Sequence, residues 1–463
     1  MIRVALPRGE LRGPTAALLE RSGLPLPGYA SGARELRFVL DDRGVAFRVF
    51  REEDIPVQVA LGNYDVGICD LAWIREHLIR YPNEGLVPLR DLGFGRSRLV
   101  VAAPERSHVP PTGVRIVTQH PNIAEAMAVA LRLPRYRVFP VWGAAEAYPP
   151  EDADVALVAV SDGALKRAGL RELHTVLESS AWLVANRRSL AEKRLSAVLG
   201  PLLAKGGRAT PPPFTFPSRL DLADGGPEPP RDVFRIALPD GHAQRHTVEA
   251  LRDAGIRVEG YGETPERRLR ADVPGVEVKV IRPQDMPQQV ALGQFDLAIT
   301  GRDWLLSHLY QFPSSPVREL VDLRRSRYVV AAAVHESVPA ATLEEALAHW
   351  RDHGVRIVRV ASEYANIADH FARDRRLGRY RVIPVTGASE AFVPEDAEIL
   401  VEGTETGSSF RANRLKILET ILESTACLIG PAARPPGKRG ELFDEIVERF
   451  RSSVQAGALA GGP

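Results

Sequence analysis

Short apolar runs alternate along the chain with segments that have helical periodicity. The strand candidates of the first 160 residues are RVALP, LRFVL, AFRVF, YDVGIC, RLVVAAP, VRIVTQ, YRVFPVW and VALVAV. The segments DIPVQVALG and NIAEAMAVALRL between them read as helices. Alternation of this kind predicts an α/β fold with largely parallel or mixed sheets.

The whole pattern occurs twice. IRVALPRGE at residue 2 returns as FRIALPDGH at residue 234, and FREEDIPVQVALGNYDVGI at residue 50 returns as IRPQDMPQQVALGQFDLAI at residue 281. RYRVFPVWGAAEAYPPEDADVALV at residue 135 returns as RYRVIPVTGASEAFVPEDAEILV at residue 379. The offset grows from 231 (281 minus 50) to 244 (379 minus 135), so we expect insertions inside the second copy, one of them around VPAATLEEALAHWRDHG. Ordered matches of this length predict a tandem duplication.

A Pro- and Gly-rich stretch, residues 205–232, separates the two copies and reads as a semi-extended linker. It predicts a first unit at residues 1–204 (copy one) and a second at 233–456 (copy two). Each unit is long enough for two lobes with a cleft, and we expect the second lobes at about 95–175 and 326–420. Ligands of open α/β sheets bind beyond the carboxyl ends of strands, which directs attention to the loops after VALVAV and EILVE.

Composition narrows the function classes only a little. The 463 residues carry 60 Lys and Arg against 59 Asp and Glu, so any site for an anion must be local. Cys69 and Cys427 are too few and too far apart for a disulfide framework or a zinc site. The N-terminus shows no export signal and no apolar run approaches a membrane span, so we expect a cytoplasmic protein.

The most informative stretch is ILVEGTETGSSFRAN, residues 399–413, which reads as strand, loop and helix. Gly403 and Gly407 permit unusual backbone angles. Ser408 and Ser409 are candidate N-caps for a helix through FRANRLKILETILE, residues 410–423. The backbone N–H groups at such a helix start, together with neighbouring Thr and Ser hydroxyls, predict a phosphate-binding site.

Two acids flank these hydroxyls. Glu402 and Glu405 are poor phosphate ligands, but they suit vicinal sugar hydroxyls or the outer coordination sphere of Mg²⁺. A phosphorylated sugar satisfies both halves of the motif, while a simple capped helix stays as the alternative. In copy one the same place reads ADVALVAVSDGALKRAGL, where Asp162 and Gly163 remain but the hydroxyls and acids are gone.

With these residues the sequence resembles ATP phosphoribosyltransferase, the enzyme that opens histidine biosynthesis. The family loop carries an acid, Thr-Gly, Ser/Thr pairs and Leu-Arg-Ala-Asn, with Asp commoner where Glu402 stands here. Further segments resemble family landmarks: ALPRGEL at residue 5, FREEDIP at 50, DLGFGRSRLVVAAP at 91, IRPQDMP at 281, FDLAITGRDWL at 295, ASEYANIADHF at 361 and GASEAFVPED at 387.

The resemblance implies a tandem duplication of a two-lobed unit like type II periplasmic binding proteins. It implies transfer of the phosphoribosyl group of phosphoribosyl pyrophosphate to N1 of ATP, with Mg²⁺ as cofactor and pyrophosphate as the second product. The implied catalytic residues are Glu402 and Glu390. The implied phosphoribosyl pyrophosphate ligands are Glu402, Gly403, Thr404, Glu405, Thr406, Gly407, Ser408 and Ser409. The implied nucleotide ligands are Arg8, Arg268, Arg282, Asp285, Gly301 and Asp303, and no metal ligand is assigned.

The two copies depart from the family pattern in complementary ways. Copy one keeps Arg8 and the glycines of DLGFGRSR but has lost the sugar-phosphate loop. Copy two keeps the loop but reads Asp240 where a basic residue is usual, and DLRRSR where the glycines stood. We therefore expect an intramolecular pseudo-dimer with one working site, completed by basic groups from copy one. Further oligomers or a regulatory subunit stay open.

The alternative is a catalytically inactive paralogue that acts as a regulatory subunit or a nucleotide or phosphosugar sensor, which Asp240 favours. Several residues also have plainer readings. Arg282 and Asp285 suit a loop salt bridge, and Arg34 and Arg268 suit either phosphate binding or solvent. The tryptophans, Trp73, Trp142, Trp182 and Trp304, are expected to pack in the core or between lobes rather than to stack on adenine.

Overall fold

Every strand expected in copy one is present in the computed structural model, which describes residues 1–82, 85–105, 113–160, 164–204, 207–220, 222 and 233–460. The first lobe of copy one is a six-stranded sheet in the order β2-β3-β1-β4-β11-β5. Its strands are β1 (Ile2–Pro7), β2 (Arg37–Leu40), β3 (Val45–Phe50), β4 (Val66–Asp70), β5 (Leu86–Asp91) and β11 (Ala181–Asn186). β1 is parallel to β3 and β4, whereas β11 is antiparallel to β4.

The second lobe of copy one is a five-stranded sheet in the order β10-β6-β9-β7-β8. Its strands are β6 (Ser97–Pro104), β7 (Val114–Thr118), β8 (Tyr136–Pro140), β9 (Val155–Val160) and β10 (Leu170–Ser179). The helices that the site uses in copy one are α3 (Ile55–Ala60), α4 (Leu71–Arg80), α5 (Pro121–Ala130) and α6 (Ala164–Arg167). Two adjacent α/β lobes per copy match the predicted architecture.

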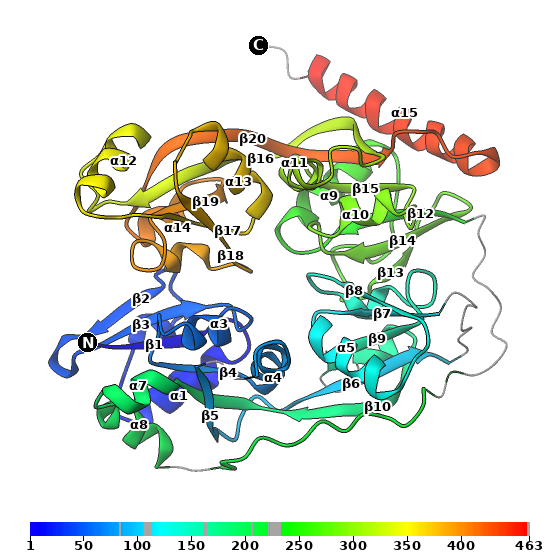
Figure 1. Cartoon of the computed structure of the whole chain (residues 1–463). Coiled ribbons are helices and arrows are strands. Elements are labelled where there is room, and N and C mark those ends of the chain that lie inside the picture. Colours follow the sequence, from blue (N-terminus) through cyan, green and yellow to red (C-terminus); the bar gives the residue numbers. More distant parts are fainter. Residues whose placement is uncertain are drawn as a thin grey trace.

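Copy two repeats both lobes within one continuous nine-stranded sheet, in the order β13-β14-β12-β15-β20-β16-β19-β17-β18. Its strands are β12 (Phe234–Pro239), β13 (Arg268–Arg270), β14 (Val276–Ile281), β15 (Leu297–Gly301), β16 (Val317–His335), β17 (Val358–Ser362), β18 (Tyr380–Pro384), β19 (Ile399–Thr404) and β20 (Leu415–Pro431). Its helices are α9 (Gln244–Asp253), α10 (Met286–Ala291), α11 (Arg302–Gln311), α12 (Leu343–Asp352), α13 (Ala365–Asp374), α14 (Ser408–Ala412) and α15 (Gly437–Ala460). The sheet is continuous because β16 and β20 run through both lobes (Figure 1).

The copies pack head to tail, so that the first lobe of each lies against the second lobe of the other (Figure 1). On one side Arg48 of β3 pairs with Glu395 at 2.5 Å. On the other side Lys279 of β14, whose side chain is 2% exposed, pairs with Glu151 at 2.8 Å and Asp152 at 2.6 Å. These contacts occupy equivalent positions of the duplicated sequence, so the two interfaces are related by a pseudo-twofold axis.

The hinge between the lobes keeps its backbone conformation although its residues differ. In copy one Gly93 and Gly95 have φ of 78° and 64°. The equivalent residues of copy two, Arg324 and Ser326, have φ of 55° and 52°. Glycine adopts these positive φ values without a steric penalty, whereas a residue with a Cβ is strained there. The loss of both glycines therefore left the shape of the hinge unchanged and added strain.

The expected helix through residues 410–423 is wrong beyond its first turn. α14 ends at Ala412, Arg414 has φ of 58°, and β20 begins at Leu415. The segment ILETILE has Leu, Glu and Ile at helical spacing, but pairing with β16 decides its conformation. The predicted insertion in copy two contains α12. No helix in the described ranges is long and apolar enough to cross a membrane.

Relief of the hinge strain gives a test. We expect Ser326→Gly to raise the free energy of unfolding by up to about 1 kcal/mol, because glycine adopts φ near +52° without a steric penalty. Gly93→Ala, with a Cβ that meets no neighbour within 4 Å, should lower it by roughly 1 kcal/mol through strain alone. Urea denaturation of both variants measures the two changes. A lower stability of the Ser326→Gly variant would contradict backbone strain at Ser326.

Candidate functional site

The polar loop predicted from the sequence follows β19 and is ordered by its own hydroxyls. The backbone N–H of Gly407, which has φ of 66°, donates to Thr404 Oγ1 at 2.9 Å. Thr406 Oγ1 donates to Ser408 Oγ at 3.0 Å. The helix N-cap is Gly407 rather than the predicted Ser408 or Ser409, which lie in the first turn of α14. The structure thus gathers the Thr and Ser hydroxyls of the predicted site around one turn.

Three glutamates meet at the start of this loop. Glu402 accepts hydrogen bonds from Ser389 Oγ at 2.7 Å and from the N–H of Gly403 at 2.9 Å. Burial and the neighbouring charges of Glu363 and Glu390 raise the pKa of Glu402 well above its usual range. Burial also raises the pKa of Glu363, which Arg51 opposes and Glu390 reinforces. Glu402 and Glu363 therefore hold protons more readily than ordinary carboxyl groups.

The loop of copy two rests on the first lobe of copy one. Arg34 donates to Ser408 Oγ, and the N–H of Leu36 donates to Asn413 Oδ1 at 3.0 Å. Arg37 donates to the carbonyl oxygens of Asn413 at 2.7 Å and Glu390 at 2.9 Å. Arg34, which the sequence left between phosphate binding and solvent, is thus held against the loop. Copy one supplies cationic side chains to the loop of copy two.

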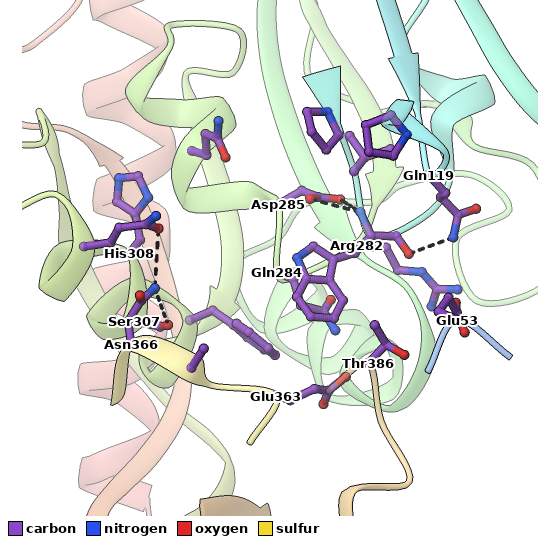
Figure 2. A pocket seen from close by; sticks show the side chains of 18 of the residues that line it. Glu53, Gln119, Arg282, Gln284, Asp285, Ser307, His308, Glu363, Asn366 and Thr386 are labelled. Carbon is purple, nitrogen blue, oxygen red and sulfur yellow. Dashed lines mark hydrogen bonds between the residues drawn. The ribbon is translucent and has the colours of Figure 1, made fainter. Parts of the chain in front are cut away.

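A cavity of about 520 Å³ lies between the copies, next to the glutamate cluster, and side chains from both copies face it (Figure 2). Its walls contain residues that occupy equivalent positions in the two copies: Arg51 and Arg282, Trp73 and Trp304, Gln119 and Glu363, and Trp142 and Thr386. The cavity therefore lies near the pseudo-twofold axis. Its two halves differ, since copy two contributes Glu363 where copy one contributes Gln119.

Two of the predicted nucleotide ligands line this cavity (Figure 2). Asp285 accepts hydrogen bonds from the N–H of Trp142 at 3.1 and 3.2 Å. Arg282 forms a salt bridge with Asp240, the residue directly after β12, at 3.1 Å. Its partner is therefore Asp240 and not Asp285 of its own loop. Asp240 also binds Arg267 at 2.7 Å. The acid that stands where a basic residue is usual thus pairs with two arginines, of which Arg282 lines the cavity.

The other four predicted nucleotide ligands lie outside the walls of this cavity. Arg268 is bound to Glu151 and to the carbonyl oxygen of Ala147 at the interface between copies. Asp303 is fully buried, and a Cβ on Gly301 would lie 2.1 Å from its carboxylate. Arg8 is exposed on copy one. Nucleotide binding by these residues stays a prediction.

Sequence reasoning missed Arg51 and left two settings open for the tryptophans. Arg51 is the copy-one counterpart of Arg282, so aligning the two copies with each other would have revealed it. Trp182 is 1% exposed and lies in the core as expected. Trp142 is 37% exposed in the cavity and lies against Trp304 of copy two with ring centroids 6.0 Å apart, so of the two expected settings, core or between lobes, it has the second. The eroded loop residues Asp162 and Gly163 lie outside the described residues.

Within the described ranges, no group of three or more His, Cys, Asp and Glu side chains is arranged to hold a metal ion. Mg²⁺ commonly binds through one or two carboxylates plus substrate phosphates, and the glutamate cluster fits that arrangement. The residues are therefore compatible with Mg²⁺ that arrives with a phosphorylated substrate.

The fold and the site define a duplicated two-lobed α/β protein in which arginines of copy one contact a hydroxyl-rich loop of copy two. The HisG family, ATP phosphoribosyltransferase, matches residues 51–204 and 282–452. The chain is 33% identical over 239 residues to the ATP phosphoribosyltransferase of Chlorobium phaeovibrioides, which covers 50% of this chain and 74% of that protein. It is 30% identical over 241 residues to the ATP phosphoribosyltransferase of Chelativorans sp., covering 47% of this chain and 98% of that protein.

A solved ATP phosphoribosyl transferase (HisG:HisZ) complex from Thermotoga maritima aligns with a TM-score of 0.39 at 23% identity, covering 44% of this chain and 98% of that chain. The family match over both copies is decisive: the chain belongs to the ATP phosphoribosyltransferase family. The resemblance, the enzyme class and the duplicated two-lobed fold are thereby confirmed.

Buried acids at the interface predict how stability depends on pH. Burial raises the pKa of Asp285 to about 8, and burial raises the pKa of its counterpart Asp54 to about 7. Because the ordinary value is about 4, the folded protein binds more protons than the unfolded chain between pH 4 and these values. Stability should therefore fall as pH rises from about 5 to 8, by at most roughly 1.4 kcal/mol per pH unit for each acid.

Asp54→Asn combined with Asp285→Asn should make this dependence shallower, because the amide does not titrate; buried acids such as Glu52, with a pKa raised to about 8, keep part of the slope. Urea midpoints measured from pH 5 to 8.5 compare the variant with the wild type. Arg268 lowers the pKa of Glu151 to about 2. Acids of this kind lose their contribution to stability only below about pH 4, so they do not affect the measurement between pH 5 and 8.5. An unaltered slope in the double variant would contradict the assignment.

Proposed function

We propose that the chain transfers the phosphoribosyl group of phosphoribosyl pyrophosphate to N1 of ATP, in the cytoplasm, with one working site at the loop of copy two. One observation carries the single site: the complete loop is docked onto copy one through Arg34, Arg37 and Asn413. At the position of Glu402 copy one has Val158, on β9. Copy one thus contributes side chains to the loop of copy two as a second subunit of a dimer would.

The loop suits the 5′-phosphate of the sugar. The Thr and Ser hydroxyls and the first-turn N–H groups of α14 donate hydrogen bonds, and Arg34 adds a charge that strengthens them. Glu402 lies at the end of β19, where its carboxylate can accept from ribose hydroxyls. As the bond to pyrophosphate breaks, the ribose becomes cationic, and the carboxylates of Glu402 and Glu390 stabilise it. No covalent nucleophile is required.

The cavity beside the cluster suits the charged ends of the substrates. Arg51 faces it from copy one with no hydrogen-bond or ion-pair partner in the described part of the chain, and it is available for phosphate oxygens. Glu363 in the cavity wall would help to hold Mg²⁺, which would supply positive charge to the pyrophosphate leaving group. These side chains orient the reactants, so most of the rate enhancement comes from placement and charge.

A second candidate, a phosphosugar or nucleotide sensor without turnover, is favoured by Asp240. Its carboxylate holds Arg267 and Arg282, which removes two cations from ligand binding. The purified chain with ATP, phosphoribosyl pyrophosphate and Mg²⁺ separates the candidates. We expect phosphoribosyl-ATP, followed by its ultraviolet absorbance. Ligand binding without product would replace the transferase by the sensor.

Removal of one loop hydroxyl tests where the reaction occurs. Thr406→Val keeps the size of the side chain but removes its hydrogen bond to Ser408, so we expect turnover to fall at least tenfold. Arg167→Ala, in the eroded loop of copy one, is the matched control and should keep its rate within twofold. Steady-state rates of both variants decide. An active Thr406→Val enzyme would place the site elsewhere.

Removal of cations from copy one tests whether the site is shared. Arg34→Ala should raise the KM for phosphoribosyl pyrophosphate about tenfold, because a charge-assisted hydrogen bond is worth roughly 1.5–3 kcal/mol. Arg8→Ala, assayed separately, tests the basic residue that copy two lacks. If Arg34→Ala and Arg8→Ala both keep wild-type kinetics while Thr406→Val is inactive, copy one does not complete the site.

A further inference from the structure

Asp303, at the start of α11, makes hydrogen bonds that bridge the two lobes of copy two. The residue is fully buried. Its Oδ1 accepts from Ser424 Oγ at 2.6 Å and from the Tyr328 hydroxyl. Its own N–H donates to Ser424 Oγ at 3.2 Å. Burial raises the pKa of Asp303, while hydrogen bonding from Ser424 and Tyr328 opposes that rise.

The two tyrosines carry these contacts from the first lobe to the phosphate loop. Tyr364 lies at the N-cap of α13 in the second lobe, is 5% exposed, and packs on Trp304 with ring centroids 4.4 Å apart. A Cβ on Gly403 would lie 3.1 Å from Tyr328 Cε2 and 3.2 Å from the Tyr364 hydroxyl. The backbone of Gly403, next to Glu402, therefore rests directly on both tyrosines.

Copy one lacks the aspartate, the two tyrosines and the glycine of this connection. Ala72, Ser97, His120 and Ala159 stand where copy two has Asp303, Tyr328, Tyr364 and Gly403. Asp70 of copy one still accepts from Ser179 Oγ at 2.7 Å and Ser97 Oγ at 3.3 Å, so a carboxylate remains at the hinge. His120 is buried, and neither of its ring nitrogens has a hydrogen-bond partner. The carboxylate of copy one thus contacts serines of β6 and β10, but copy one has no tyrosines at these positions that would connect it to the end of β9.

We infer that Asp303 is a positioning residue that acts through Tyr328 and Tyr364 to fix Gly403, and with it Glu402 and the phosphate loop, relative to the first lobe. The inference rests on the proposed function of the loop. It assigns Asp303 an indirect role in place of the nucleotide contact expected from the sequence. The lobes hold a productive orientation only while the network is complete, since its members belong to both lobes and the strands between them.

Conservative substitutions test the inference. Tyr364→Phe and Asp303→Asn should each lower kcat at least tenfold while the KM for ATP stays within twofold. The double variant should be no slower than the slower single variant, because both changes break one network. Asp70→Asn, at the hinge of copy one, is the matched control and should keep kcat within twofold. Far-ultraviolet circular dichroism and urea midpoints verify that each variant is folded.

The affinity for ribose 5-phosphate, measured by calorimetry, provides a readout independent of turnover and should fall at least fivefold in Tyr364→Phe. If the wild-type chain makes no product, the proposed function fails, and the affinity for ribose 5-phosphate alone then tests whether Asp303 positions the loop. Unchanged kcat and affinity in folded Tyr364→Phe would overturn the inference. So would additive losses in the double variant, or an equal loss in Asp70→Asn, because either result describes a general weakening of the fold.

Discussion

The packing of each first lobe against the second lobe of the other copy is the constraint on which the rest of the structure depends. Burying the Lys279 ammonium is favourable only because Glu151 and Asp152 accept its hydrogen bonds. Arg48 depends on Glu395 in the same way. These pairs fix the register of the two copies, and that register brings Arg34 to the loop and Arg51 to the cavity. The walls of the cavity and the contacts of the loop therefore draw side chains from both copies.

The sequence predicted those structural features that are determined by residues close together in the chain. Duplication, strands and the loop around Thr406 are written in local patterns, and the structure gathers the loop hydroxyls as expected. The helix through residues 410–423 failed because pairing with β16, distant in sequence, overrides the local preference of Leu, Glu and Lys. The contact between Arg37 and Glu390 joins residues 353 positions apart, and no local pattern reveals it.

Copy one, which has lost the polar loop, keeps the residues that pack against copy two. Copy one retains the carboxylate of its hinge as Asp70 and its glycines, and it contributes cations to the site of its partner copy. Copy two has lost the glycines and a basic residue but keeps the loop and its supporting tyrosines. The two copies thus depart from the family pattern at different places.

The head-to-tail packing also has a mechanical consequence. Two composite blocks, each made of lobes from different copies, are joined at two pivots. One pivot is the pair of continuous strands β16 and β20, and the other is the glycine-bearing crossing near Gly93. A rigid rotation of one block against the other must bend both pivots about a shared axis. Any such rotation therefore meets the resistance of the glycine-bearing crossing of copy one and of the continuous strands of copy two at the same time.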